Sequence, residues 1–327
     1  MKKVLVLGAT GFIGGHIAKA ALAEGWQVVG FRRQKDKLGH LAGMPILWME
    51  GDLNDPASLK SAMQECEIVF HAAAFYPKKG QSKNVIDLIR NAKSEISNVL
   101  DMAVETKIKR LVFTSTLTTI GKPPTDEDRL ANEMDFYQLG SSPKSGYAET
   151  KSIMEHAVIQ AANEHLDAVI VNPAALFGPG DVHITLGSLL IATAKGWMKA
   201  WLPGQINVVD VRDVARAHIV AAIKGKRGER YILGGRNYSV REALTIVAET
   251  ANVPPPKFHL PIFLIDLLVL LGDLFPFLSL PANHMRGIRD WQGYDISKAE
   301  KELDLEVRYF EDTVRDALSW FKENGHY

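Results

Sequence analysis

The stretch Val4-Leu5-Val6-Leu7-Gly8-Ala9-Thr10-Gly11-Phe12-Ile13-Gly14 decides how this chain folds. The apolar run Val4 to Leu7 has the length of a strand and stops at Gly8, which predicts a strand buried on both faces of a parallel sheet. Apolar residues then recur at helical spacing from Phe12 to Glu24, and Gly25 stands where a helix C-cap is expected. The chain therefore begins with a strand, a glycine-rich turn and a helix.

Strand-like and helix-like segments continue to alternate, which predicts an α/β fold: a doubly wound parallel sheet of the Rossmann type with helices on both faces. After Asn172-Pro173 and the loop Gly178-Pro179-Gly180 the alternation becomes irregular, so a smaller, mostly helical lobe is expected to begin there. Later strand and helix material is expected to return to the sheet. The predicted division is residues 1–172 plus about 206–235 for the first domain, and about 173–205 and 236–327 for the lobe.

Composition excludes several classes of protein. The 327 residues contain 38 Lys and Arg and 38 Asp and Glu, so no excess positive charge is available for a nucleic-acid backbone. The single cysteine, Cys66, cannot form an internal disulfide, and the cytoplasm is the expected compartment. The histidines, among them His71, His156, His165 and His218, lack metal-ligand spacing, so no metal site is expected.

The glycine-rich turn carries the first functional prediction. Its GxxGxxG pattern lies between a strand and a helix, where glycines let the backbone approach a pyrophosphate and the helix N-terminus offers free N–H groups. A glycine motif in this context predicts a dinucleotide site. The predicted binding residues in this turn are Gly8, Thr10, Gly11, Phe12, Ile13 and Gly14.

The end of the second predicted strand bears on which dinucleotide binds. An NAD site usually has an acid there for the ribose 2′-hydroxyl, but this chain has Arg32 and Arg33. A guanidinium suits a 2′-phosphate, so NADP(H) is predicted in preference to NAD(H). Two solvated arginines on a loop, with NAD(H) as cofactor, are the alternative.

Tyr147 and Lys151 are four residues apart on a predicted helix, so both side chains project from one face. A phenol with a pKa near ~10 is a poor proton shuttle at neutral pH, and a nearby ammonium stabilises its phenolate. Downstream of a dinucleotide loop, the pair is expected to work as a general acid or base.

These residues resemble the extended short-chain dehydrogenases/reductases, and the resemblance covers nearly the whole chain. The motifs in order are the Gly8–Gly14 loop, Gly51-Asp52-Leu53, His71-Ala72-Ala73-Ala74, Thr114-Ser115-Thr116, Tyr147-Ala148-Glu149-Thr150-Lys151, and Asn172-Pro173 with Phe177-Gly178-Pro179-Gly180. The resemblance implies a Thr116, Tyr147 and Lys151 catalytic set, with Ser115 as a near miss for the hydroxyl. It also implies cofactor contacts from Asp52, Leu53, Ala72, Ala73, Thr114, Tyr147, Lys151, Pro173 and Leu176.

Within the family, the chain looks like the dihydroflavonol-4-reductase-like branch. Nucleotide-sugar enzymes of the family usually carry an arginine where this chain has Ile206, although Arg212, Arg216 or Arg236 are candidates to replace it. The expected activity is NADPH-dependent reduction of a ketone or aldehyde. The alternatives are a sugar or nucleotide-sugar epimerase or dehydratase and a non-catalytic dinucleotide-binding regulator. The family resemblance also implies a homodimer formed by the helices near residues 85–106 and 147–165.

The segment Leu260 to Leu280 is the most hydrophobic of the chain, but Pro261, Asp266, Asp273 and Pro276 interrupt it, so no integral membrane span is expected. It is interpreted as a buried helix pair lining the lobe, with an apolar substrate mouth or a weak peripheral membrane contact as the alternative. Phe177, Trp197 and Trp201 are consistent either with core packing or with a small-molecule substrate of apolar character.

Overall fold

In the computed structural model, the first part of the chain forms a parallel sheet with the strand order β10-β6-β5-β4-β1-β2-β3. The structure describes residues 1–35, 38–73, 85–141, 146–264, 267, 270 and 292–327. The strands of this sheet are β1 (Lys3–Leu7), β2 (Gln27–Arg32), β3 (Ile46–Glu50), β4 (Ile68–His71), β5 (Arg110–Thr114), β6 (Ala168–Pro173) and β10 (Arg230–Leu233). The predicted Rossmann-type sheet is therefore confirmed.

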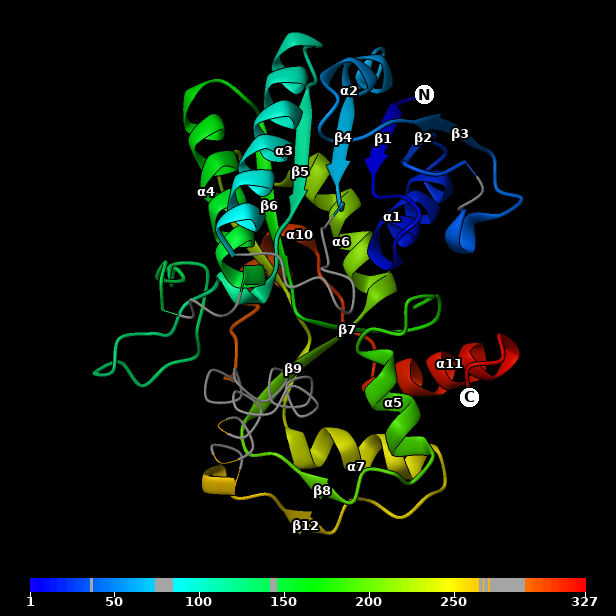
Figure 1. Cartoon of the computed structure of the whole chain (residues 1–327), viewed down its shortest axis with the longest axis vertical. Helices are drawn as coiled ribbons and strands as arrows, with labels where there is room; N and C mark the ends of the chain where they lie inside the picture. The colour runs from blue at the N-terminus through cyan, green and yellow to red at the C-terminus, as the bar shows by residue number, and fades with distance from the viewer. Residues whose placement is uncertain (36–37, 74–84, 142–145, 265–266, 268–269, 271–291) are drawn as a thin grey trace.

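Helices cover both faces of this sheet (Figure 1). One face packs on α1 (Phe12–Ala23), α6 (Val211–Lys224) and α10 (Ser297–Leu303), and the other on α2 (Pro56–Met63), α3 (Val85–Glu105) and α4 (Gly146–Glu164). Val4 and Val6 belong to the first hydrophobic core, whereas Leu5 and Leu7 belong to the second. Because side chains alternate along a strand, a strand buried on both faces has to be apolar at every position.

A smaller lobe lies below the sheet in Figure 1. It contains a three-stranded sheet of β7 (Ala175–Phe177), β9 (Gln205–Asp210) and β11 (Arg236–Ser239), and a two-stranded pair of β8 (Ala200–Trp201) and β12 (Phe258–His259). The helices α5 (Gly187–Ala194), α7 (Val240–Thr250) and α11 (Phe310–Glu323) enclose its own hydrophobic core, which includes Phe177, Leu190, Val247 and Phe321.

Residues 206–235 were expected to return as a whole to the first domain, but they are shared between the two sheets. Strand β9 runs parallel to β7 and antiparallel to β11, so it lies in the small sheet, while α6 and β10 join the large one. Helix α10, expected in the lobe, packs on the large sheet through Ala299 and Leu303. A short apolar run such as Val208-Val209 fits either sheet, because pairing partners and not hydrophobicity decide its place. The domain boundaries themselves stay a prediction.

Asp210 joins the two parts at the end of β9. Its carboxylate accepts hydrogen bonds from the Arg212 backbone N–H at 2.8 Å and from the Thr313 hydroxyl of α11 at 2.9 Å, and it forms an ion pair with the Arg212 guanidinium. One buried side chain thus caps α6 and anchors α11 of the lobe.

The carboxyl ends of the parallel strands meet at one edge of the large sheet. Leu7 is in register with Phe31 and His71, His71 with Phe113, and Thr114 with Val171. The loops that follow β1, β4, β5 and β6 therefore leave the sheet at the same edge, and ligands of open α/β sheets bind in the crevice outside this edge.

Most of the apolar segment Leu260 to Leu280 lies outside the described residues, and so does Ala74 of the His71-Ala72-Ala73-Ala74 motif. In the part of the chain that the structure describes, no helix combines the length and the apolar character needed to cross a bilayer.

Candidate active site

The glycine-rich turn is a cradle that only glycines can form. Gly8 has φ +87°, and a Cβ on it would lie 2.7 Å from the backbone nitrogen of Ala73; a Cβ on Gly14 would collide with the carbonyl oxygen of Gly8. The N-cap of α1 is Gly11, which provides no side-chain hydrogen bond, so the first N–H groups of the helix are left for a ligand. The cradle fits the pyrophosphate of a dinucleotide.

The loops beside this cradle present the other predicted cofactor residues. One oxygen of the Asp52 carboxylate accepts a hydrogen bond from the Asn54 backbone at 2.9 Å, and the Leu53 carbonyl accepts one from Asn98 of α3 at 2.9 Å. The Ala72 N–H donates to the Leu7 carbonyl at 3.0 Å, which extends the sheet by one residue next to the cradle. These contacts fix the loop backbones and leave the second Asp52 oxygen available to a ligand.

Exposure divides the predicted site residues into a lining and a layer beneath it. The partly exposed ones are Gly8, Thr10, Gly11, Phe12, Ile13, Asp52, Leu53, Ala72, Ala73, Thr116, Tyr147 and Leu176. Gly14, Thr114, Lys151 and Pro173 are buried. The sheet edge therefore gathers residues that are up to 168 positions apart in the sequence, from Gly8 to Leu176.

Arg32 and Arg33 differ in how far their side chains are open to solvent. The Arg32 guanidinium lies over the Trp48 ring at 5.0 Å and within 3.6 Å of the Glu50 carboxylate, so β3 holds this side chain against the sheet. Arg33 is exposed at the start of the following loop. Of the two arginines, Arg33 is the one whose charge is open to a ligand.

Lys151 is buried on the sheet side of α4. Its Nζ donates a hydrogen bond to the Thr114 carbonyl at 3.0 Å and lies 5.3 Å from the centre of the Phe113 ring. Burial lowers the pKa of Lys151 to about 8, and the Glu155 and Glu95 carboxylates oppose this shift. Tyr147, one turn earlier on the helix, is partly exposed at the crevice. A buried ammonium and a partly exposed phenol on one helix face are the two groups that an acid–base pair would need.

The Thr114 hydroxyl has a structural task. It lies 2.9 Å from Nε2 of His218, whose Nδ1 lies 2.8 Å from the Val214 carbonyl. Because a carbonyl only accepts, Nδ1 carries the proton and Nε2 accepts the Thr114 hydrogen; burial keeps this imidazole neutral by lowering the pKa of His218 to about 4. Thr114 therefore meets Lys151 through its carbonyl, and its side chain faces α6.

Thr116 is the N-cap of the short helix η2 (Leu117–Thr119), and its hydroxyl accepts a hydrogen bond from the Thr118 N–H at 3.3 Å. It remains partly exposed at the crevice. Ser115 is buried instead, with its Oγ 3.3 Å from Oγ1 of Thr119. Of the two hydroxyls, that of Thr116 is the one that a substrate can reach.

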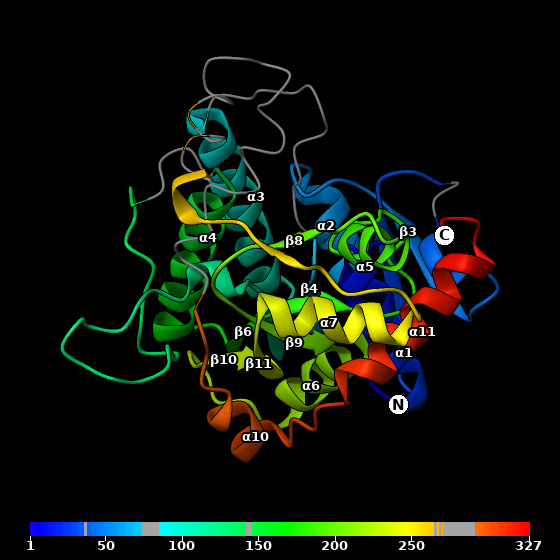
Figure 2. The same ribbon diagram turned by 90° about the horizontal axis from the view of Figure 1, so that it is seen from below.

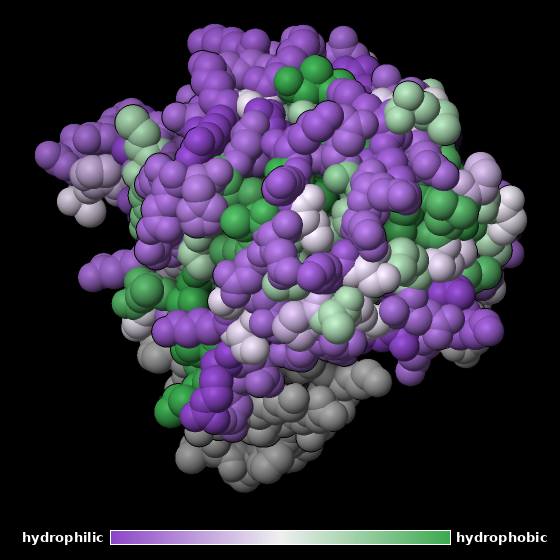
Figure 3. Space-filling view, turned by 90° about the horizontal axis from the view of Figure 1, so that it is seen from above, coloured by the Kyte–Doolittle hydropathy of each residue, from purple (hydrophilic) through white to green (hydrophobic). Residues whose placement is uncertain are grey.

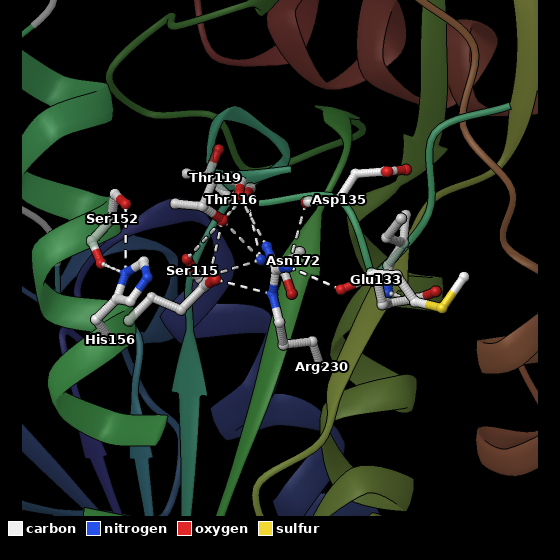
Figure 4. Close-up of polar contacts among 12 residues, drawn as sticks. Ser115, Thr116, Thr119, Glu133, Asp135, Ser152, His156, Asn172 and Arg230 are labelled. Atoms are coloured by element: carbon white, nitrogen blue, oxygen red, sulfur yellow. Dashed lines mark hydrogen bonds and ion pairs between the residues drawn. The ribbon is translucent and has the colours of Figure 1, made fainter. Parts of the chain in front are cut away.

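A buried polar network lies behind these residues (Figure 4). The Glu155 carboxylate accepts hydrogen bonds from the Thr119 hydroxyl at 2.7 Å and the Asn172 amide at 2.8 Å, and its other oxygen lies 2.8 Å from Nε of Arg230 in an ion pair off the line of a hydrogen bond. Glu155 is 0 % exposed and Arg230 4 %. We call Thr119, Glu155, Asn172 and Arg230 the Glu155 network; it joins η2, α4, β6 and β10.

Arg230 also reaches the long segment after η2. Its guanidinium donates to the carbonyls of Thr119 and Glu133, each at 2.8 Å, and stacks 4.1 Å from the centre of the Phe136 ring. The sequence motifs did not predict this network. Glu155 follows Tyr147 and Lys151 at the same four-residue spacing, which was a usable signal, whereas nothing in the sequence near Arg230 indicates its partner.

The loop after β7 is held to the cradle helix. Nε2 of His16 donates to the Pro179 carbonyl at 2.8 Å, and burial lowers the pKa of His16 to about 4, so the imidazole is a neutral donor. The rings of His16 and His40 are 4.7 Å apart. This contact fixes the Gly178-Pro179-Gly180 loop beside α1 and the entrance to the crevice.

The remaining histidines and aromatics have separate locations. His71 is buried against Phe113, and Nδ1 of His156 lies 2.7 Å from the Ser152 carbonyl. Within the described residues, no three His, Cys, Asp or Glu side chains gather as metal ligands. Phe177 packs against Phe310 in the core of the lobe, whereas Trp197 is exposed at its far end.

Comparison with known proteins identifies the family of this chain. Residues 4–234 match the model of the NAD dependent epimerase/dehydratase family. A Synechocystis protein provisionally named as a dihydroflavonol 4-reductase is 32% identical and aligns with 98% of this chain and 95% of its own length. Sterol demethylase protein B of Methylococcus capsulatus is 30% identical over 98% of both chains.

A solved structure shares the fold over the whole chain. The crystal structure of a nucleoside-diphosphate-sugar epimerase from Pseudomonas aeruginosa superposes with a TM-score of 0.84 at 25% identity, covering 100% of this chain and 99% of the other.

Replacing Gly8 tests the cradle. Gly8→Ala puts a Cβ against the Ala73 backbone at a positive φ, so we expect it to weaken dinucleotide binding at least ~10-fold in calorimetry. Gly25→Ala is the matched control, since Gly25 has φ +73° and a Cβ added to it would meet no atom within 4 Å. Equal dinucleotide affinity in the two variants would contradict the assignment of the cradle.

Removing one partner tests the Glu155 network. Arg230→Met leaves the buried Glu155 charge uncompensated, so we expect a loss of about 3–5 kcal/mol in the free energy of unfolding by urea. The double variant Glu155→Leu/Arg230→Met should recover much of that loss. Arg315→Met, which breaks the exposed pair with Asp312, serves as the control and should leave the urea midpoint in place. If the losses in unfolding free energy of the two single variants simply add up in the double variant, Glu155 and Arg230 are not coupled.

Proposed function

Because the chain belongs to the NAD-dependent epimerase/dehydratase family, within the extended short-chain dehydrogenases/reductases, we propose that it reduces a ketone or aldehyde at the expense of NADPH. Membership makes the chain an NAD(P)-dependent reductase or epimerase. The observation that supports the finer proposal is the hydrogen bond from Nζ of Lys151 to the Thr114 carbonyl at 3.0 Å, which brings α4, the helix that carries Tyr147, against the end of β5 two residues before Thr116.

The chain's own residues have distinct tasks in this reaction. A bound nicotinamide supplies the hydride. The Thr116 hydroxyl donates a hydrogen bond to the substrate carbonyl oxygen, and the Tyr147 phenol delivers the proton to that oxygen. The Lys151 ammonium stabilises the phenolate that remains, because an adjacent positive charge favours the ionised form of an acid. The cradle and the loops after β4 and β5 hold the reacting atoms at fixed distance.

Two arginines that could bind the diphosphate of a nucleotide sugar are already paired with carboxylates, which supports the reductase over the nucleotide-sugar enzyme. Arg212 is engaged by Asp210 and Asp316, and Arg216 pairs with Glu306. Ile206 offers no charge at the position where nucleotide-sugar enzymes usually have an arginine. Among the candidate diphosphate ligands named from the sequence, Arg236 alone forms no ion pair in the described structure, and it stacks over Tyr309 at 4.7 Å.

An epimerase is the second candidate. The similarity to the Pseudomonas aeruginosa nucleoside-diphosphate-sugar epimerase over the whole chain favours it. In that case the nicotinamide is reduced and reoxidised within one turnover, so no net change in cofactor occurs. A non-catalytic dinucleotide-binding regulator would not need Thr116, Tyr147 and Lys151 together, which argues against that alternative.

The proposal includes the cofactor, the compartment and the assembly. Arg33 supports NADP(H), because its exposed guanidinium can pair with a 2′-phosphate.

Burial raises the pKa of the Cys66 thiol to about 11, which suits an inert cysteine in the cytoplasm. Helices α3 and α4 pack side by side on one face of the sheet and are the surface that we propose for a homodimer.

The reductase proposal is tested by net cofactor consumption. With NADPH and a panel of aromatic and alicyclic ketones and aldehydes, we expect stoichiometric loss of nicotinamide absorbance, and Tyr147→Phe should lower kcat about 10²–10⁴-fold with the affinity for NADPH retained. Tyr309→Phe, an exposed tyrosine, is the control. Isomerisation of a nucleotide sugar without net NADPH loss would overturn the proposal in favour of the epimerase.

The same assay has a defined pH dependence. Lys151 is charged below its pKa of about 8 and neutral above it, and reduction needs the charged form. We therefore expect kcat/KM for reduction to be constant below this value and to fall as the pH rises through it. A kcat/KM that increases as the pH rises above that pKa would contradict the role of Lys151 as an ammonium.

Cofactor choice is tested at Arg33. Arg33→Ala should lower the ratio of kcat/KM for NADPH to that for NADH about 10-fold, because one charge-assisted contact to phosphate is lost. Lys35→Ala, an exposed cation two residues later, is the matched control and should leave the ratio unchanged. A wild-type preference for NADH would overturn the NADP(H) proposal without affecting the reductase proposal.

A further inference from the structure

Two segments of the lobe share an unusual composition. Residues 195–201 read Lys-Gly-Trp-Met-Lys-Ala-Trp, and residues 257–264 read Lys-Phe-His-Leu-Pro-Ile-Phe-Leu. Together they contain three lysines, four large aromatic residues and no acid, in a chain whose formal net charge is zero. Neither segment takes part in the cradle or in the Glu155 network.

The fold brings the two segments together. Strands β8 and β12 pair with Phe258 opposite Ala200 and His259 opposite Trp201. The Lys257 N–H donates to the Lys199 carbonyl at 3.0 Å, and the Leu260 N–H donates to the Trp201 carbonyl at 3.0 Å. We call residues 195–201 and 257–264 the lobe tip. β8 and β12 lie at the end of the molecule away from the large sheet in Figure 1 and face the viewer in Figure 2.

Large apolar side chains of the lobe tip face solvent. Trp197 is 68% exposed, Phe258 67% and Phe263 68%. The opposite end of the molecule, seen in Figure 3, is predominantly hydrophilic, with apolar residues in small separate groups. Scattered exposed hydrophobic residues are ordinary, but three bare aromatic rings on adjoining segments indicate a surface that is covered in use.

The lysines of the lobe tip have no carboxylate partner among the residues that the structure describes. Some other surface lysines pair with acids, as Lys60 does with Glu105 and Lys226 with Glu302, whereas Lys322 has no ion pair among the described residues. Lys195, Lys199 and Lys257 form no ion pair anywhere in the described part of the chain, and Lys195 lies over the Trp197 ring at 5.1 Å. The lobe tip is therefore a region of uncompensated positive charge next to exposed aromatic rings.

We propose that the lobe tip docks peripherally on the surface of a lipid bilayer that carries anionic headgroups. Tryptophan is favoured at the depth of the headgroups, and each lysine near an anionic membrane surface adds to the attraction. The exposed aromatic rings would suit a protein partner as well, but lysine is depleted in protein–protein interfaces, so the three lysines favour the membrane surface. The interaction needs no membrane-spanning helix, because aromatic side chains at the interface and cations at the headgroups suffice for reversible binding.

Docking in this manner would bring the substrate lobe, and not the dinucleotide domain, to the membrane. The inference does not depend on the proposed reaction, because vesicle binding is measured without substrate or turnover.

The test is co-sedimentation of the purified full-length protein with large unilamellar vesicles. We expect binding to vesicles of phosphatidylcholine mixed with roughly one-third phosphatidylglycerol, marked weakening at high salt, and little binding to pure phosphatidylcholine. Lys195→Gln/Lys199→Gln/Lys257→Gln should reduce the partition coefficient on anionic vesicles by about fivefold per lysine. Trp197→Ser/Phe258→Ser/Phe263→Ser should reduce binding to anionic vesicles at low and high salt alike.

Matched controls separate the lobe tip from general surface properties. Lys60→Gln/Lys109→Gln/Lys322→Gln removes the same charge elsewhere, and Met134→Ser/Ile223→Ser removes exposed apolar side chains outside the lobe tip. Both should bind vesicles like the wild type, and all variants should keep the wild-type midpoint of thermal unfolding to within a few degrees. Vesicle binding that is absent in the wild type, or equally lost in the controls, would overturn the proposal. So would a wild-type dimer that the lobe-tip variants convert to monomer without any vesicle binding, since the occupant would then be a second copy of the chain.

Discussion

The carboxylate of Glu155 is buried completely, and the elements that carry the proposed reacting groups are arranged around it. A charge taken out of water is tolerated only when other groups replace the lost hydration. Thr119, Asn172 and Arg230 do so here, and they come from η2, β6 and β10. Satisfying one charge therefore fixes the α4 helix against η2, β6 and β10.

This arrangement has a direct consequence for the crevice. Thr116 precedes η2, and its carbonyl accepts a hydrogen bond from the Thr119 N–H, while Lys151 on α4 reaches back to the Thr114 carbonyl. The backbone that carries Thr116 is therefore fixed twice at this sheet edge. The η2 turn holds it after Thr116, and Lys151 of α4 holds it before Thr116. The Glu155 network therefore supports the backbone on which the proposed reacting groups stand.

The two ends of the lobe have different characters. Where it meets the large sheet, Asp210, Arg212 and Thr313 form a buried polar junction, and His16 binds the Pro179 carbonyl. At the lobe tip, aromatic and basic side chains remain uncovered. The buried junction joins the lobe to the large sheet at one end, and the membrane contact that we propose is at the other.

The sequence by itself determined the local structure and the class of site. Periodicity and backbone sterics act over a few residues, so they predict local features. These features are the strand at Val4–Leu7, the glycine turn, and the placement of Tyr147 and Lys151 on one helix face. Family motifs added Asp52, Ala72 and Thr116. The tertiary structure alone decided that β9 joins the small sheet, that β3 holds Arg32 while Arg33 stays open, and that Arg230 pairs with Glu155. It also brought residues 195–201 and 257–264 into one surface. These outcomes depend on contacts between segments far apart in the chain, and neither hydrophobic spacing nor residue type at one position specifies which distant partner a side chain meets.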